Sequence, residues 1–231
     1  AIDAAVAVGL MLGVVDGYNS GIGGGAFLLI RRADGELIAL DGREMAPAAA
    51  TRDMYLRQGR ADIALSQTGA LASAVPGALA AYERARRAYG RKPLADLIAP
   101  AAKVAEDGLP VTDAYSRRIR SAADALKRFE ASRAILFRAD GQPLAEGDVL
   151  RQADLGRSYR AIAREGIDWF YRGAYAQAVD AWMRANGGVM TAADFKSYEV
   201  KARTPVSSTY RGYTLVGMGP PSSGGVHVAQ P

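Results

Sequence analysis

The stretch SGIGGGAFLLIR, residues 20–31, decides the fold class. Its glycine-rich half follows an apolar, helix-like segment over residues 1–15, and its apolar half is typical of a strand. A dinucleotide-binding turn has the opposite order, because its glycines follow a strand and open a helix. The stretch also lacks the Lys-Ser/Thr pair of a phosphate-binding loop. We therefore interpret residues 20–25 as a tight helix-to-strand loop that needs positive φ angles and close backbone approach.

The residues after this loop predict a β-hairpin in a central sheet. Ala26–Arg31 and Glu36–Leu40 are short apolar runs, and the Asp34-Gly35 pair between them is a strong turn signal. A helix starting in the glycine loop would contradict this prediction.

The middle of the chain is mainly helical, and its end is extended. Proline, glycine and capping signals predict helices over residues 76–89, 94–107, 112–129, 153–164 and 173–186, and Thr191 caps a further short helix. Residues 200–218 are predicted to be extended, with a turn at Arg211-Gly212. These patterns indicate an α/β or α+β domain.

The composition excludes several kinds of site. The chain has no cysteine and a single histidine, His227. Disulfides, iron–sulfur clusters, cysteine nucleophiles and histidine-rich metal sites are therefore excluded, and we expect neither a metal nor a cofactor. The net charge is +5, but the Lys and Arg residues are interleaved with acids along the chain and form no long basic run. We therefore expect no nucleic-acid partner. The apolar segment over residues 1–15 is too short to span a membrane.

One candidate ligand-binding side chain is Arg43, in Asp41-Gly42-Arg43-Glu44-Met45-Ala46-Pro47. It follows a predicted strand, and its guanidinium fork matches the two oxygens of a carboxylate. The flanking acids Asp41 and Glu44 are suited to hold the fork in place. The alternative is a purely structural ion pair with one of these acids, and the residues alone leave both interpretations open.

A second motif is Pro220-Pro221-Ser222-Ser223-Gly224-Gly225-Val226-His227. The stiff prolines and the serines predict a capped helix start. His227 is close enough in sequence to serve Ser222 or Ser223 as a base, but no third member of a triad is suggested. We favour the structural interpretation.

Both ends of the chain suggest a fragment. Residues 1–15 already have the pattern of a helix interior, and a new apolar run begins only five residues before the end. We expect residues 1–231 to be one domain-sized piece, truncated at both ends.

Several of these motifs, taken in order, resemble the γ-glutamyltranspeptidase family. The resemblance runs over nearly the whole chain and is carried by DAAVA at 3–7, SGIGGG at 20–25, REMAP at 43–47, PG at 76–77, residues 101–108, MT at 190–191, Tyr198, RTP at 203–205, YRGY at 210–213 and PPSSGG at 220–225.

The resemblance implies an α+β fold, the αββα sandwich of the N-terminal-nucleophile hydrolases, present here as part of the large subunit with a helical region. It also implies a precursor that cleaves itself before a threonine, whose free α-amine then serves as base for its own hydroxyl. This threonine and the small subunit that carries it, the expected partner, lie outside the chain. The implied substrates are γ-glutamyl amides such as glutathione, and family habit implies a periplasmic or secreted enzyme.

Only one site residue is carried over by the resemblance. Arg43 matches the arginine that binds the substrate α-carboxylate, and no catalytic residue is expected within the chain. The sequence departs from the family pattern at residues 16–19 and at Ala26, where a fourth glycine is frequent. A cephalosporin-acylase-like hydrolase and a non-catalytic binding or scaffold domain therefore remain alternatives.

Overall fold

The computed structural model describes residues 1–230. Its helices are α1 (Ile2–Val15), α2 (Ile63–Gln67), the 3-10 helix η1 (Ala70–Ala72), α3 (Ala78–Tyr89), α4 (Leu94–Asp107), α5 (Asp113–Ser121), α6 (Ala123–Leu126), α7 (Glu130–Leu136), α8 (Ala153–Glu165), α9 (Asp168–Tyr171), α10 (Ala174–Ala185), α11 (Ala192–Ser197) and α12 (Gly224–Ala229). Its strands are β1 (Ala26–Arg31), β2 (Leu37–Gly42), β3 (Leu56–Arg57), β4 (Arg60–Ala61), β5 (Leu109–Pro110), β6 (Val149–Leu150), β7 (Lys201–Arg203), β8 (Val206–Tyr210) and β9 (Tyr213–Gly217).

The predicted hairpin forms the centre of the main sheet. β1 and β2 are antiparallel, with Ala26 opposite Gly42 and Arg31 opposite Leu37. The turn uses Gly35 at φ +88°, a conformation that glycine adopts without steric cost. β7 pairs with the other edge of β2, which gives the order β1-β2-β7. The hairpin prediction is therefore confirmed, and β2 extends two residues beyond the predicted end.

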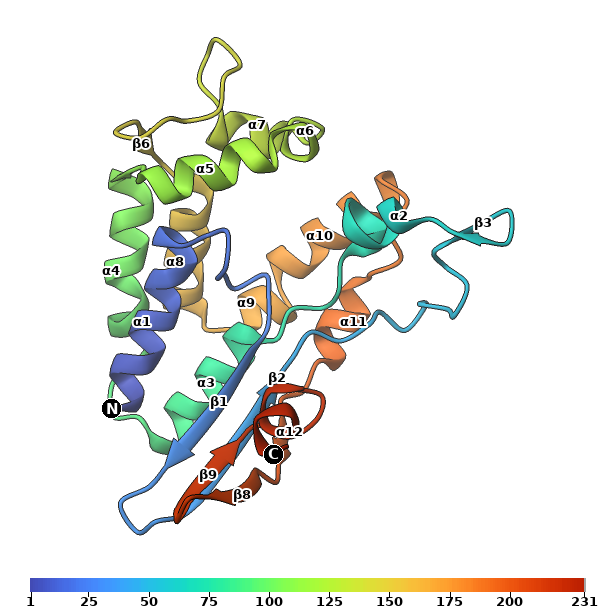
Figure 1. Cartoon of the computed structure of the whole chain (residues 1–231). Coiled ribbons are helices and arrows are strands. Elements are labelled where there is room, and N and C mark those ends of the chain that lie inside the picture. The colour runs from blue at the N-terminus through green and yellow to red at the C-terminus, as the bar shows by residue number, and fades with distance from the viewer. Residues whose placement is uncertain (231) are drawn as a thin grey trace.

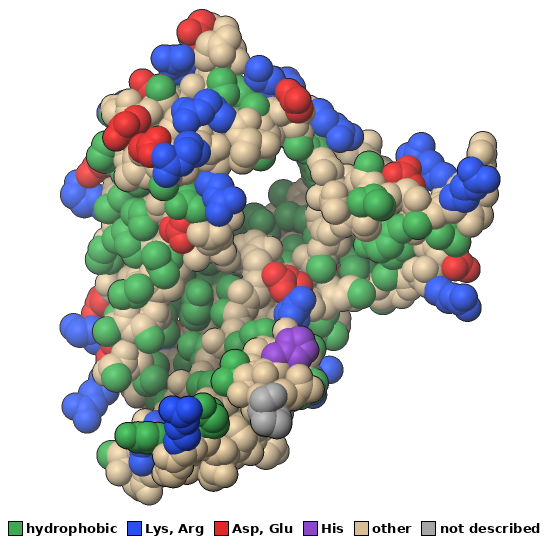
Figure 2. Space-filling model, in the orientation of Figure 1, with side chains coloured by type: hydrophobic (Ala, Val, Ile, Leu, Met, Phe, Trp, Pro, Cys, Tyr) green, Lys and Arg blue, Asp and Glu red, His purple; other side chains and the backbone are tan. Residues whose placement is uncertain are grey.

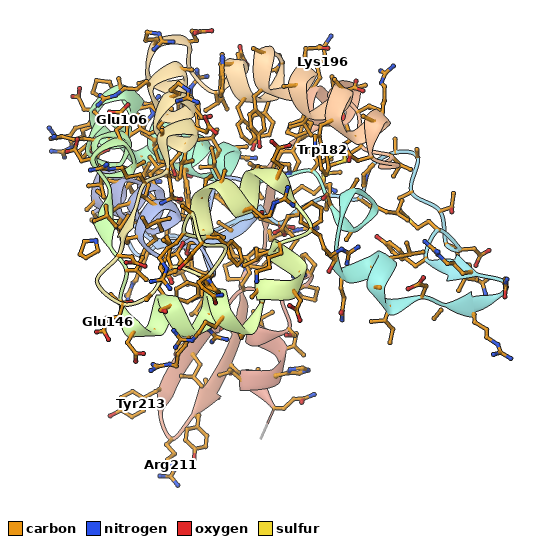
Figure 3. All side chains as sticks on the ribbon, turned by 90° about the horizontal axis from the view of Figure 1, so that it is seen from above. Glu106, Glu146, Trp182, Lys196, Arg211 and Tyr213 are labelled. Carbon is orange, nitrogen blue, oxygen red and sulfur yellow. The ribbon has the colours of Figure 1, made fainter. Side chains whose placement is uncertain are left out.

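The sheet lies between a helical layer and a second hairpin. Ile30 and Leu40 pack against Ala85 of α3, so α3 covers one face of the sheet. The hairpin β8–β9, with α12 packed against it, lies in front of this sheet, and α3 lies behind it (Figures 1 and 3). The succession of helix, sheet and second β layer corresponds to part of an αββα sandwich.

The largest hydrophobic core lies within the helical layer and joins α1, α3, α4, α8, α9, α10 and α11. Leu10, Tyr159 and Phe195 are among its largest fully buried side chains. Although α1 is apolar on all sides, the side chains of Val8 and Leu12 are exposed. The predicted helix over residues 1–15 is thus confirmed, but it is buried on only part of its surface.

Two predictions about local structure are wrong. The helix expected over residues 112–129 breaks at Ala122 into α5 and α6, which lie with α7 at the top of Figure 1. In the loop over residues 20–25, no glycine has a positive φ angle.

Within residues 1–230, no helix combines the length and the apolar character that crossing a membrane requires.

Candidate active site

Arg43 lies directly after β2, where the antiparallel pairing ends. Its side chain is 55% exposed, and its ion pair in residues 1–230 joins Nε to Glu44 Oε2 at 3.5 Å. A guanidinium carries several N–H donors, so most of those on Arg43 remain free for a ligand. The exposure and the single long contact favour a ligand-binding role over a purely structural ion pair.

Asp41 holds the backbone of Arg43 rather than its fork. The Asp41 carboxylate is only 5% exposed, and its Oδ2 accepts a hydrogen bond from Arg203 Nε at 2.9 Å and forms an ion pair with Arg203 Nη2 at 2.8 Å. Its Oδ1 accepts a hydrogen bond from the Arg43 backbone N–H at 3.0 Å. The suggested role of Asp41 as a clamp on the guanidinium is therefore wrong, because its charge is already paired with Arg203.

Tyr198 reaches the same residue from the other side. Its hydroxyl donates a hydrogen bond of 2.8 Å to the backbone carbonyl oxygen of Arg43, across 155 positions in sequence. Burial, with smaller contributions from the Asp41 and Glu44 carboxylates, raises the pKa of Tyr198 to about 12. The hydroxyl therefore keeps its proton, and remains a donor, well above neutral pH.

The glycine-rich loop is shaped by Glu44 and by the start of α3. A Cβ on Gly25 would lie 2.6 Å from Glu44 Oε2 and 2.9 Å from the carbonyl oxygen of Gly42, so a larger residue would collide there. The Gly24 carbonyl oxygen accepts hydrogen bonds from the N–H groups of Gly77 and Ala78 at 3.0 and 2.9 Å. The prediction of close backbone approach is thus confirmed, although its cause is a neighbouring carboxylate rather than a φ angle.

These groups line a small cavity of about 170 Å³. Its lining joins the end of β2 and the loop after it, β7 with the segment before it, and the proline motif. The lining residues are Asp41, Arg43, Glu44, Met45, Tyr198, Glu199, Lys201, Arg203 and Pro221. Three of these side chains are acidic and three are basic, but the buried pair of Asp41 and Arg203 neutralises one of each. Of the other two lining cations, Arg43 and Lys201, Arg43 carries the planar fork of donors that matches a carboxylate.

The proline motif supplies a wall of this cavity but no recognisable catalytic pair. The six-residue helix α12 begins after Ser223, whose side chain makes no capping bond, and Ser222 Oγ accepts from the Gly224 N–H at 3.2 Å. The His227 backbone N–H donates to the Ser223 carbonyl oxygen at 2.9 Å within the first turn of the helix, but among residues 1–230 no hydrogen bond joins the His227 side chain to either serine hydroxyl. Figure 2 shows His227 on the surface below a hollow in this face of the molecule. The structural interpretation of the motif therefore agrees with its geometry.

Local patterns in the sequence pointed to Arg43 and missed its two supports. Tyr198 contacts the Arg43 backbone across 155 positions in sequence, and Arg203 acts on it through Asp41. Both contacts depend on the pairing of β7 with β2. Strand pairing at this separation has no local signal. The available hint was that both residues belong to the ordered motifs of the family resemblance.

Comparisons with known proteins agree over the whole described chain. A family model described as gamma-glutamyltranspeptidase matches residues 1–230. The glutathione hydrolase proenzyme of Escherichia coli strain K12 is 45% identical over 232 residues, which is 100% of this chain and 40% of that protein. The Acylase ACY 1 proenzyme of Pseudomonas sp. strain V22 is 40% identical over 100% of this chain and 42% of its own length.

A solved structure gives the same result for the fold. The crystal structure of Helicobacter pylori gamma-glutamyltranspeptidase superimposes with a TM-score of 0.96 at 41% identity, over 99% of this chain and 66% of that one. This likeness confirms the predicted α+β fold and the αββα sandwich to which the elements belong. The chain spans about two fifths of the length of the curated relatives that it matches.

Proposed function

The chain belongs to the γ-glutamyltranspeptidase family, and on that premise we propose that it is the large-subunit part of an enzyme that cleaves γ-glutamyl amides such as glutathione. The glutamyl group passes to water, an amino acid or a peptide through an acyl-enzyme on an N-terminal threonine outside the chain. Residues 1–231 form one piece of this subunit. The observation that carries the proposal is the free guanidinium of Arg43, on a backbone held from both sides.

Arg43 would recognise the α-carboxylate of the donor. A γ-glutamyl group carries this carboxylate at a fixed distance from the amide that is cleaved, so one bidentate contact places the reacting carbonyl. The contact is charge-assisted on both sides and contributes about 1.5–3 kcal/mol to donor binding. The threonine would carry out the bond cleavage, and Arg43 of this chain would position the donor for it.

The partner in this proposal is a small subunit that is cut from the same precursor. Two of the relatives described above are named proenzymes, which supports a processed, two-subunit assembly. Neither a cofactor nor a metal enters the reaction, since the α-amine and hydroxyl of the threonine supply base and nucleophile.

An acylase is the second candidate, because the chain is 40% identical to an acylase proenzyme. The two candidates differ in how they treat the donor α-amine. A γ-glutamyl transferase needs it, whereas a hydrolase of glutaryl amides acts on donors without it. We expect the complete protein to turn over a γ-glutamyl anilide faster than the matching glutaryl anilide. The opposite order would favour the acylase, and turnover of neither would favour a non-catalytic domain.

Substitution of Arg43 tests the proposal directly. In the complete, processed protein we expect Arg43→Ala to lower kcat/KM for a γ-glutamyl anilide by about 10- to 100-fold, mostly through KM. Arg43→Lys keeps the charge but loses the fork, so we expect an intermediate loss. Cleavage of the precursor is checked first by gel electrophoresis, because an unprocessed variant would show the same loss.

Two controls separate recognition from damage. Arg52→Ala removes another arginine that contacts only the acid next to it, with Nε 3.8 Å from Asp53 Oδ1, and we expect parental kinetics. A 4-aminobutyryl anilide keeps the amine and lacks the α-carboxylate, so its turnover should barely respond to Arg43→Ala. If a processed Arg43→Ala protein handled γ-glutamyl donors like the parent, Arg43 would be structural.

A further inference from the structure

Arg43 differs from its neighbours in that side chains, rather than a paired strand, hold both of its backbone polar groups. Its N–H donates to Asp41 Oδ1 at 3.0 Å, and its carbonyl oxygen accepts from the Tyr198 hydroxyl at 2.8 Å. Backbone pairing resumes two residues later, where Met45 and Val75 exchange hydrogen bonds of 3.1 and 2.8 Å. The orientation of the two peptide groups that flank the Arg43 Cα therefore depends on these two side chains.

The Tyr198 ring is held in place by the neighbouring ring of Tyr171. Its ring stacks on the ring of Tyr171, with centroids 5.8 Å apart and planes inclined by 19°. Tyr171 is 4% exposed, and its hydroxyl donates to the Pro76 carbonyl oxygen at 3.0 Å and accepts from the Ala80 N–H at 3.2 Å. A ring held by stacking and a neighbour held by two hydrogen bonds leave the Tyr198 hydroxyl few alternative positions.

A glycine opens the space through which the hydroxyl reaches Arg43. A Cβ on Gly77 would lie 1.9 Å from the Tyr198 hydroxyl oxygen and 2.3 Å from the carbonyl oxygen of Gly42. Any other residue at position 77 would displace the tyrosine or the end of β2. The contact between Tyr198 and Arg43 is thus built into the packing of three separate segments.

Resting on the proposed function, we propose that Tyr198 is a positioning residue for donor recognition, whose hydroxyl orients the Arg43 backbone so that the guanidinium faces the donor carboxylate. Asp41, anchored by Arg203, holds the Arg43 N–H, and Tyr198 holds the Arg43 carbonyl group, so the peptide groups on both sides of the Arg43 Cα are fixed. Without the hydroxyl, the carbonyl group is free to rotate, and the fork samples directions that do not match the carboxylate. The affinity for the donor then falls, while the chemical step is unchanged.

Tyr198→Phe tests this inference, because it removes the hydroxyl and keeps the stacked ring. In the complete, processed protein we expect KM for a γ-glutamyl anilide to rise by about three- to tenfold, with kcat within about twofold of the parent. Turnover of the 4-aminobutyryl anilide should stay at the parental level. In an Arg43→Ala background, the same change should have almost no effect on kcat/KM, because the hydroxyl acts through Arg43.

Tyr159→Phe is the matched control. Its hydroxyl also donates to a backbone carbonyl oxygen, that of Leu10 at 3.0 Å, but it lies in the helical core. This variant should lose thermal stability without changing the ratio of the two donors. If Tyr198→Phe is not processed, Tyr171→Phe replaces it, because loss of the anchor should produce a smaller rise in KM with the same donor selectivity.

The possible outcomes distinguish this inference from the proposed function. The positioning role would be overturned if processed Tyr198→Phe had the parental KM, or if it lost activity equally with both donors. The proposed function would still stand in that case, provided that Arg43→Ala lost activity with the γ-glutamyl donor alone. Parental KM in a processed Tyr171→Phe protein would overturn it when Tyr198→Phe does not mature. If the parent turned over neither donor, or Arg43→Ala behaved like the parent, the proposed function itself would fail.

Discussion

At the scale of single residues, the ion pair between the buried Asp41 carboxylate and Arg203 stabilises the fold around the site. The Asp41 side chain is 5% exposed and that of Arg203 is 37% exposed, so the carboxylate relies on this arginine for its neutralisation. A buried carboxylate that loses its partner is costly, because neither water nor another cation replaces the hydrogen bonds.

We therefore expect Arg203→Ala to lower the free energy of unfolding by about 1–3 kcal/mol, a value reduced for the partial exposure of the arginine. Arg117→Ala breaks a surface pair with Asp113 whose side chains are 61% and 49% exposed, and it should cost less than about 0.5 kcal/mol. The measurement is thermal unfolding of the processed proteins. Equal decreases in the free energy of unfolding for the two variants would show that the ion pair of Asp41 and Arg203 stabilises the fold no more than a surface pair does.

The same residues show what the sequence allowed us to predict. Arg43 was identified because a lone arginine between a strand and a loop has a local signature. Its supports were not, because the contacts of Tyr198 and Arg203 depend on a pairing between β2 and a three-residue strand whose side chains are all exposed. Such a strand carries no hydrophobic alternation from which its register could be derived.

At the scale of elements, the glycine-rich loop divides into positions that need glycine and positions that do not. A Cβ on Gly23 would meet nothing within 4 Å, whereas a Cβ on Gly25 would collide with the Glu44 carboxylate and the Gly42 carbonyl oxygen. Neither residue has a positive φ angle, so the difference is one of space alone.

We expect Gly25→Ala to destabilise the protein by about 1–3 kcal/mol, because the β2 backbone has to move, and Gly23→Ala to stay within about 0.5 kcal/mol of the parent. Thermal unfolding of both variants measures this difference. Gly25→Ala should also raise KM for γ-glutamyl donors, since Glu44 adjoins Arg43. Equal stability of the two variants would contradict the close approach.

The start of α11 is joined to the loop after Arg43 by one carboxylate. Asp194 accepts hydrogen bonds from the Thr191 N–H and hydroxyl at 2.7 and 2.8 Å, and from the Ala48 N–H, 146 positions away in sequence, at 2.8 Å. Burial alone would raise the pKa of Asp194, but the hydrogen bonds from Ala48 and Thr191 outweigh it and hold the pKa below the ordinary 3.8.

A lowered pKa makes this stabilisation dependent on pH. The contribution is present above the ordinary pKa of 3.8 and is lost as the pH falls through the lower value of the folded protein. We expect Asp194→Asn to be less stable than the parent by about 1–2 kcal/mol at neutral pH, with a gap that narrows below about pH 4. Asp124→Asn, which changes an exposed carboxylate, is the control for unfolding curves at each pH. A gap that stayed constant down to pH 2 would contradict the assigned role.

Helices and strands were predicted correctly from the sequence where residues at their own ends mark them. The β1–β2 hairpin and the helix over residues 94–107 have the predicted ends or nearly so, because a turn glycine or a terminal glycine marks them. The helix predicted over residues 112–129 is interrupted at Ala122, which is exposed and adopts φ −109° and ψ 8° although alanine is a good helix former. No residue signal in this stretch marks the break, so it could not be predicted from the sequence.

At the scale of the whole molecule, the structure supplies one end of a binding site. The cavity at Arg43 has about 170 Å³, whereas sites that enclose small organic ligands have roughly 300–1,000 Å³. The hairpin β8–β9 leads into the Pro221 wall of this cavity, and its tip, with Arg211 and Tyr213, points away from the helical layer (Figure 3). The described residues thus place the exposed Arg43 guanidinium beside a cavity that is too small to enclose an organic ligand.

We therefore expect the chain of residues 1–231 alone to show no turnover of a chromogenic γ-glutamyl anilide. Ser222, Ser223 and His227 are the nearest approach to a nucleophile with a base, and within residues 1–230 no hydrogen bond joins the His227 imidazole to either serine hydroxyl. The complete, processed protein at the same concentration is the positive control, and a heat-treated sample of the chain is the blank. Turnover above that blank, abolished by Ser222→Ala or Ser223→Ala, would place a nucleophile within the chain and overturn the assignment of the reaction to an external threonine. Absence of turnover, with activity in the complete protein, would leave Arg43 as an anchor that needs the rest of the enzyme to act.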